Sequence, residues 1–123
     1  MSSQLAGHPT PPPAVAAADR EWIHSRNALG IARLLVHEGR PAELVGTACR
    51  MSVEAACRVA LERASFPYDG DLERGLRRLS APVDLIAGLD DGQPAARLAA
   101  CERALGFLSG YLRSESPERS WTF

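Results

Sequence analysis

The chain has 123 residues, enough for one domain, and its formal net charge at pH 7 is -1. With 46% hydrophobic and 24% charged residues it has the composition of an ordinary globular protein. The small net charge excludes an overall field that would gather nucleic acid or an anionic membrane, so any such contact must come from local patches.

Residues 1–13 combine Ser, Gly, Thr and a cluster of prolines, which predicts a disordered Pro-rich arm. A helical bundle domain is expected over residues 14–114, followed by a polar C-terminal tail over 115–123. The N-terminus does not follow the pattern of a signal peptide, and charged residues interrupt the most apolar stretch, so no membrane segment is expected. Three cysteines without metal-ligand spacing favour a reducing compartment, and the predicted location is the cytoplasm.

The first predicted helix runs from residue 15 to residue 38 and ends at Gly39, a typical stop signal. Apolar residues recur along it at helical spacing, which predicts one stripe that faces the core. The members of this stripe are Ile23, Ala28, Ile31, Leu34 and Leu35.

The second predicted helix, residues 42–64, follows Pro41 and carries two adjacent apolar stripes, so it is expected at the centre of the bundle. One stripe contains Leu44, Ala48, Met51, Ala55 and Val59, and the other contains Val45, Cys49, Val53, Cys57 and Leu61. The remaining face alternates in charge at i,i+4 spacing, which predicts paired, solvated side chains at Arg50, Glu54, Arg58 and Glu62.

Two short helices and one long helix complete the prediction. The third helix, residues 71–79, has Asp69 or Asp71 as a possible cap and places its arginines near its C-terminal end, as the helix dipole favours. A short fourth helix ends near Gly88. The last helix, residues 94–114, carries the seam Leu98, Cys101, Leu105, Leu108 and Leu112. No segment alternates as a strand does, so the predicted fold is an all-α, up-down bundle of four to five helices.

Five side chains are candidates for binding a phosphate-bearing ligand. Arg20 and His24 form an i,i+4 pair on the first helix, and the third helix carries Arg74, Arg77 and Arg78. The alternative is that all five are solvated surface residues. No catalytic motif is present, and His24 and His37 would lie about 20 Å apart on one helix, so no catalytic residue, metal or cofactor is assigned.

The layout resembles the HEPN family of small helical domains. The resemblance rests on the run "SVEAACRVAL", residues 52–61, and on Asp71, Leu72, Leu76 and Leu79 in the next helix. It implies a bundle that dimerises and often works in RNA metabolism or in toxin-antitoxin pairs with a nucleotidyltransferase. Ribonucleases of the family carry Arg, four to six residues, and then His in the C-terminal half. Here no histidine follows His37, so a binding module is expected rather than an enzyme.

Two alternatives to a binding module remain open. One is a ribonuclease or nucleotide-processing enzyme that uses an atypical site around Arg20, His24 and the arginines of the third helix. The other is a helix-turn-helix over residues 71–89, which the neutral, Leu-rich second half of that segment disfavours.

An interface is also expected, because a small Ala-rich core leaves large apolar residues over. The candidates are Trp22, Ile23, Phe107 and Tyr111. The expected partner is a second copy of the chain or another protein, with RNA or a nucleotide as a possible ligand. The alternative is that the short fourth helix and the C-terminal tail, with Trp121 and Phe123, cover these side chains.

Overall fold

The computed structural model describes residues 13–117 and 120–122. These residues form five helices and no strand, which confirms the all-α class and the helical bundle. The helices are α1 (Pro13–His37), α2 (Ala42–Arg63), α3 (Leu72–Arg78), α4 (Val83–Gly88) and α5 (Pro94–Glu115). Of the predicted arm, residues 1–12 lie outside the described residues, and Pro13 begins α1.

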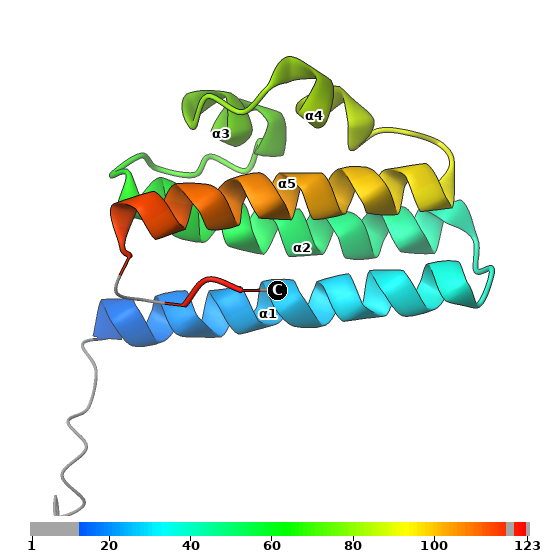
Figure 1. Ribbon diagram of the computed structural model, residues 1–123, viewed down its shortest axis with the longest axis horizontal. Helices are drawn as coiled ribbons and strands as arrows, with labels where there is room; N and C mark the ends of the chain where they lie inside the picture. Colours follow the sequence, from blue (N-terminus) through cyan, green and yellow to red (C-terminus); the bar gives the residue numbers. More distant parts are fainter. Residues whose placement is uncertain (1–12, 118–119, 123) are drawn as a thin grey trace, which may run out of the picture.

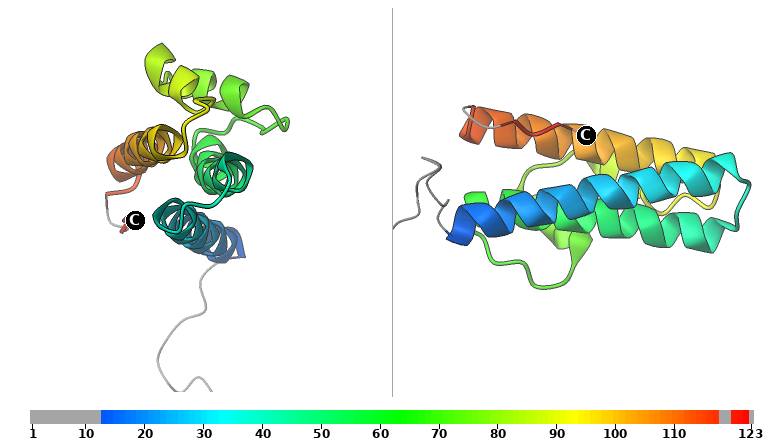
Figure 2. Two further views of the ribbon diagram at one scale, coloured as in Figure 1. Left: turned by 90° about the vertical axis from the view of Figure 1, so that its right-hand side faces the viewer. Right: turned by 90° about the horizontal axis from the view of Figure 1, so that it is seen from below.

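Three long helices, α1, α2 and α5, form the body of the bundle (Figure 1). The pair α1 and α2 is an antiparallel hairpin, and α3 and α4 lie over α2 and α5 on the side away from α1 (Figure 2). Because α3 and α4 return the chain to the end where α2 began, α5 runs parallel to α2. The up-down order is therefore kept between α1 and α2 but not between α2 and α5.

The ends of the helices follow the local signals in the sequence. Gly39, just after α1, has φ +67°, a left-handed conformation that glycine adopts at little cost. Pro41 directly precedes α2. The Asp71 carboxylate accepts a hydrogen bond from the Arg74 backbone N–H at 3.0 Å, so Asp71 is the cap of α3.

Small side chains allow α1 and α2 to pack closely. At the centre of the pair, the Ser25 hydroxyl donates to the Ser52 carbonyl at 2.7 Å, and the Ser52 hydroxyl donates to the Ser25 carbonyl at 2.8 Å. Both serines are fully buried. The buried alanines of the two helices are Ala28, Ala32, Ala48, Ala55, Ala56 and Ala60. Close approach of the backbones therefore replaces large interdigitating side chains in this part of the core.

The predicted core stripe of α1 is wrong, because the helix buries a different face. Ile23, Ile31 and Leu34 are exposed, whereas Ala28 is buried and Leu35 is partly buried against the core. The buried face consists of Trp22, Ser25, Ala28, Leu29 and Ala32. Serine and alanine contribute little to a hydrophobic pattern, so the larger residues of the opposite face dominated the sequence signal.

The stripes predicted for the other long helices are largely correct. All five residues of the second α2 stripe, Val45 to Leu61, are buried, and so are four of the five residues of the α5 seam. Leu98, the first of that seam, is partly buried against the core. In the other α2 stripe, Leu44 and Met51 are exposed, because they lie at the edge of the helix that turns away from α5.

Beyond α5, residues 120–122 lie against α1 and α5 (Figure 1). The described residues after α5, 116–117 and 120–122, are called the C-terminal strap here. Trp121 is 3% exposed and meets Trp22 edge to face, with ring centroids 5.1 Å apart. The Trp22 indole N–H donates to the Thr122 carbonyl at 3.1 Å, and the Ser109 hydroxyl donates to the Trp121 carbonyl. The predicted polar tail is therefore partly a core element, while Phe123 lies outside the described residues.

Candidate functional site

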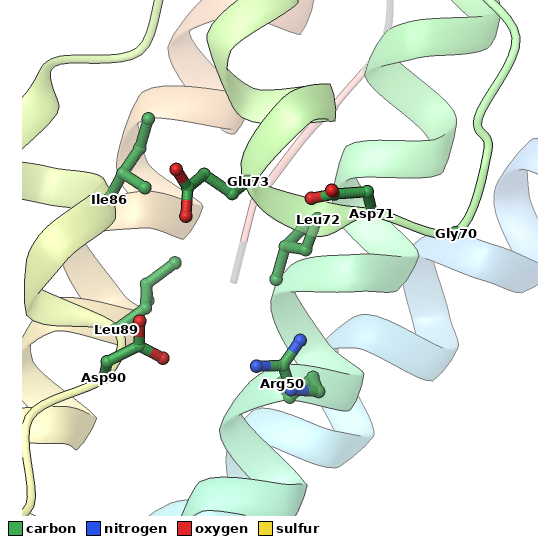
Figure 3. Close-up of a pocket in the computed structure, with 8 residues that line it drawn as sticks. All are labelled: Arg50, Gly70, Asp71, Leu72, Glu73, Ile86, Leu89 and Asp90. Atoms are coloured by element: carbon green, nitrogen blue, oxygen red, sulfur yellow. The ribbon is translucent and has the colours of Figure 1, made fainter.

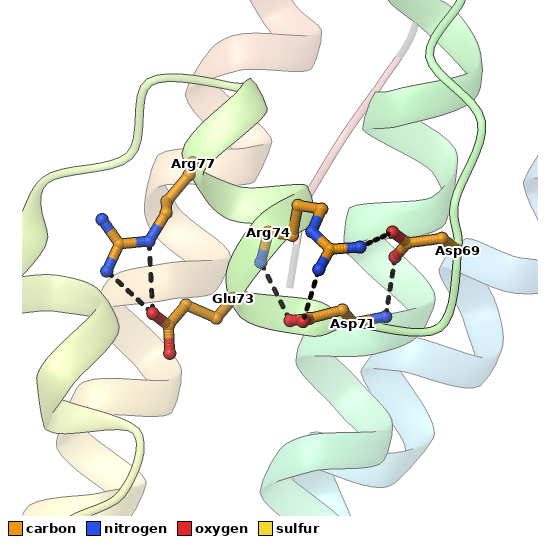
Figure 4. Close-up of polar contacts among 5 residues, drawn as sticks. All are labelled: Asp69, Asp71, Glu73, Arg74 and Arg77. Atoms are coloured by element: carbon orange, nitrogen blue, oxygen red, sulfur yellow. Dashed lines mark hydrogen bonds and ion pairs between the residues drawn. The ribbon is translucent and has the colours of Figure 1, made fainter.

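The arginines of α3 that were candidates for phosphate binding have carboxylate partners within their own segment (Figure 4). Arg74 pairs with Asp69 and lies 3.7 Å from the Asp71 carboxylate. Arg77 pairs with Glu73 at 2.7 Å. The pKa of the Asp69 carboxyl is lowered, first by the hydrogen bond from the Asp71 backbone N–H and then by the Arg74 guanidinium.

Arg78 also has a partner, because its guanidinium lies over the Phe66 ring, 5.5 Å from the centroid. Such cation–π contacts hold the charge near the protein surface without a carboxylate. Each of Arg74, Arg77 and Arg78 therefore has a partner close by on the protein surface.

Arg20 and His24 lie in a different place, at a surface cavity of about 420 Å³ between α1 and α2. The cavity is lined by Ala17, Arg20, Glu21, His24 and Arg58, so the structure brings one further cation to the predicted pair and none of the α3 arginines. Arg58 itself lies over the Tyr68 ring at 5.3 Å and 3.6 Å from the Glu54 carboxylate. Three cationic or titratable side chains around one carboxylate can hold a phosphate, but the cavity is shallow and open.

The four interface candidates differ in their exposure. Ile23 is exposed, and Phe107 and Tyr111 are half-buried against the core. Trp22 is only 4% exposed, which corrects the expectation that it is left on the surface. The physical reason is the C-terminal strap, whose Trp121 covers it, as the alternative interpretation of the tail proposed.

A larger apolar surface lies where the sequence predicted core. Of the seven large apolar side chains that the described residues expose, five belong to α1 and α2: Ile23, Ile31, Leu34, Leu44 and Met51. The first three are 52–54% exposed. They lie on one side of α1 together with Asn27 and Gly30, which are also exposed, and these five residues are called the outer face of α1 here. The outer face carries no charge over more than three helical turns.

Gly30 has no side chain and therefore leaves a flat area within the outer face. A Cβ added there would meet no atom within 4 Å, so nothing among the described residues requires a glycine at this position. A glycine inside a helix costs about 1 kcal/mol relative to alanine. The sequence analysis missed that Gly30 is exposed among apolar residues. This is visible only once it is known which face of α1 is directed towards the core.

Residues 13–117 and 120–122 contain no group of three or more metal-ligating side chains. Within the same residues, every helix is either too short or too polar to span a membrane. No protein-family model, curated protein or solved structure matches the chain.

Proposed function

We propose that the chain is a helical-bundle binding module that works as a homodimer, paired through the outer face of α1. The observation that carries the proposal is this uncharged apolar face, with Ile23, Ile31 and Leu34 more than half exposed. Exposed apolar residues that gather on one face usually mark an interface. A second copy of the chain is the occupant, for the reasons of symmetry, space and charge that follow.

The spacing of the outer face suits a two-fold axis. Positions 23, 27, 30 and 34 are separated by four, three and four residues, so they are symmetric about the point between residues 28 and 29. Two antiparallel copies of α1 that cross there place Ile23 against the partner's Leu34 and Asn27 against the partner's Gly30. A two-fold interface repeats each such pair, as isologous contacts require.

Space and charge favour the same arrangement. The open surface at Gly30 leaves room for the Asn27 side chain of the other copy. Arg20 lies one turn before Ile23, and Glu38 lies one turn after Leu34. Antiparallel pairing brings these opposite charges together at both ends of the contact, whereas parallel pairing brings like charges together.

Light scattering on a size-exclusion column tests the proposal. We expect a dimer mass for the native chain at micromolar concentration and a monomer mass for Leu34→Glu, because a carboxylate would be buried without a partner. The matched control is Val83→Glu, which places the same charge at an exposed apolar residue of α4 and should leave the dimer intact. A native monomer at every concentration, or a Leu34→Glu dimer, would contradict the proposal.

A mixing experiment tests the antiparallel register. Ile23→Lys and Leu34→Glu should each weaken the dimer when studied alone. Mixed in equal amounts, the two variants should form a heterodimer, because the lysine of one chain then faces the glutamate of the other while the second pair stays native. Failure of the mixture to recover dimers would contradict this register.

The HEPN resemblance extends the proposal to partners. A cytoplasmic module of this kind would work with another protein, such as a nucleotidyltransferase in a toxin-antitoxin pair, or near RNA or a nucleotide. Mass spectrometry of the proteins and nucleic acids that co-purify from the native host tests this part. Recovery of the chain with only itself would contradict it.

One observation favours a second candidate function, a ribonuclease or nucleotide-processing enzyme. Arg20, His24 and Arg58 line one cavity, where two arginines can hold a phosphodiester and a histidine can transfer a proton. If this candidate is correct, purified protein cleaves RNA, and His24→Ala abolishes the cleavage. Absence of cleavage, or cleavage unaffected by His24→Ala, would exclude this site as its source.

A further inference from the structure

A cleft runs between α2, the segment of α3 and α4, and α5, on the side of the bundle away from the outer face of α1. Its outer part has a volume of about 370 Å³ and its inner part about 40 Å³. Both parts are lined by Arg50, Leu72 and Leu89, so they adjoin each other. Figure 3 shows Arg50 below Leu72 and beside Leu89, with carboxylates around the rim.

Arg97 of α5 lines the inner part of the cleft, and its guanidinium occupies the space that Gly46 of α2 leaves open. A Cβ added at Gly46 would lie 1.9 Å from Arg97 Nη1, so any other residue at position 46 would displace the guanidinium. Gly46 is buried in the interior of a helix, where alanine is intrinsically preferred. The glycine is therefore explained by the position of Arg97.

The half-buried Arg97 side chain has one guanidinium nitrogen without a partner. Its Nε atom is buried and has no hydrogen-bond partner. No ion pair of Arg97 occurs among the described residues. The Arg97 charge also affects the neighbouring Cys49. The pKa of the Cys49 thiol is lowered, first by its hydrogen bond with Cys101 and also by Arg97, while burial opposes this shift.

Arg50 is a second cation without a carboxylate partner in the described part of the chain. The charge ladder of α2 predicts a pair with Glu54, but the Glu54 carboxylate instead accepts a hydrogen bond from the Tyr68 hydroxyl and lies near Arg58. Arg50 and Gly46 are one helical turn apart on α2, so Arg50 and the Arg97 guanidinium lie on the same face of this helix.

The carboxylates at the rim do not neutralise these two arginines. Asp71 caps α3 and lies beside Arg74, and Glu73 pairs with Arg77. Asp90, at the end of the cleft beside Leu89, has no ion pair in residues 13–117 and 120–122. The inner part of the cleft thus holds two arginines beside Leu72 and Leu89, and Asp90 is the rim carboxylate left for a donor group.

We propose that this cleft binds the oxyanion group of a small molecule, a carboxylate or a phosphate, between Arg50 and Arg97. The guanidinium fork suits both groups, and the oxyanion would accept the hydrogen bond that Arg97 Nε otherwise lacks. The inner part, about 40 Å³, is much smaller than the outer part, so only the anionic group of the ligand enters it. The rest of the ligand lies against Leu72 and Leu89, and a hydroxyl or amine reaches Asp90.

Nuclear magnetic resonance of the arginine side chains tests the site directly. The probes are inorganic phosphate, acetate, and glycerol 3-phosphate with glycerol as its uncharged counterpart. We expect the Arg97 Nε–H signal to shift on addition of an oxyanion and not on addition of glycerol. A larger response to phosphate than to acetate assigns the ligand to phosphate esters, and the reverse assigns it to carboxylates. No shift with any oxyanion at millimolar concentration would overturn the proposal.

Variants separate binding from folding. Gly46→Ala should displace the Arg97 guanidinium, keep or raise stability, and abolish the response to the probe. Gly106→Ala is the matched control, because it makes the same change in α5 where an added Cβ meets nothing within 4 Å. Arg97→Lys keeps the charge but loses Nε, and should bind about tenfold more weakly, as expected for one charge-assisted hydrogen bond. Unchanged binding in both Gly46→Ala and Arg97→Lys would overturn the proposal.

Discussion

Ser25 and Ser52 hold α1 and α2 together by two hydrogen bonds that run in opposite directions across the contact. Each hydroxyl reaches the backbone carbonyl of the other helix, which is possible only where the two backbones are close. The pair therefore fixes both the separation of the helices and their relative position along the axis.

The first prediction concerns the size limit at this contact. Ser52→Val should lower the free energy of unfolding by about 1–3 kcal/mol, because a larger side chain must push the helices apart. Ser52→Ala should cost less, about 0.5–1.5 kcal/mol, the usual net value of a hydrogen bond. Urea denaturation measures both. Thr47→Val, on the exposed side of α2, is the control and should change stability by less than about 0.5 kcal/mol. A Ser52→Val protein as stable as the native chain would contradict the close packing.

The second prediction concerns alkaline pH. Burial, and to a lesser extent the Glu54 charge, raise the pKa of the Cys57 thiol from 9.0 to about 12. Above pH 9 the unfolded chain therefore loses this proton while the folded chain keeps it, so stability should fall as pH rises from about 9 to 12. The pKa of the Tyr68 hydroxyl is also raised, first by burial, and acts in the same direction. Denaturation curves at several pH values measure the loss. Cys57→Ala should make it shallower, and an unchanged slope in that variant would contradict the assignment.

At the scale of elements, the C-terminal strap depends on one aromatic contact. Trp121 and Trp22 are the two tryptophans of the chain, and each packs on the other. The third prediction is that Trp121→Ala lowers the free energy of unfolding by about 3–5 kcal/mol, the usual cost of removing a buried aromatic ring. Its second effect is a red shift of the remaining emission, because Trp22 becomes accessible to water.

Intrinsic fluorescence and thermal denaturation measure both effects of this substitution. Phe66→Ala, at an exposed aromatic residue beside Arg78, is the control and should have a small effect on each. A Trp121→Ala protein with native stability and native emission would show that the strap does not cover Trp22 in solution.

Helix positions were well predicted from the sequence, but the faces of α1 were not. The α5 seam was predictable because its buried residues are mostly leucine, whereas the buried face of α1 contains Ser25 and Ala32, which give no hydrophobic signal. The same limit hid the outer face of α1. The role of a glycine is not visible in the sequence either. Gly46 and Gly30 both lie inside helices, yet Gly46 faces Arg97 and Gly30 faces open space.

The arginine sites show a different limit. Arg74 and Arg77 have carboxylate partners within five residues, so both members of each ion pair lie in one short stretch of the sequence. Arg97 lies about fifty residues from Gly46 in the sequence, and no pattern along the chain links them. Only the parallel packing of α2 and α5 brings the two together.

At the scale of the whole molecule, the proposed dimer links stability to concentration. The fourth prediction is that the melting temperature rises with protein concentration, because the folded dimer is favoured by mass action. Differential scanning calorimetry over a hundredfold range of concentration measures the rise. Leu34→Glu should melt at one temperature throughout the range, and a native chain that behaves in the same way would argue for a monomer.

The contact between Trp22 and the C-terminal strap also means that Trp22 is covered only at the end of protein synthesis. The Trp22 indole N–H and the Thr122 carbonyl that accepts its hydrogen bond are 100 residues apart. A ribosome adds about 5–20 residues per second, so roughly 5–20 seconds pass between the synthesis of the two. Throughout that interval the strap does not yet cover Trp22. The nascent chain therefore presents an uncovered tryptophan to any chaperone at the exit of the ribosomal tunnel. The first helix to be made is thus among the last to be finished.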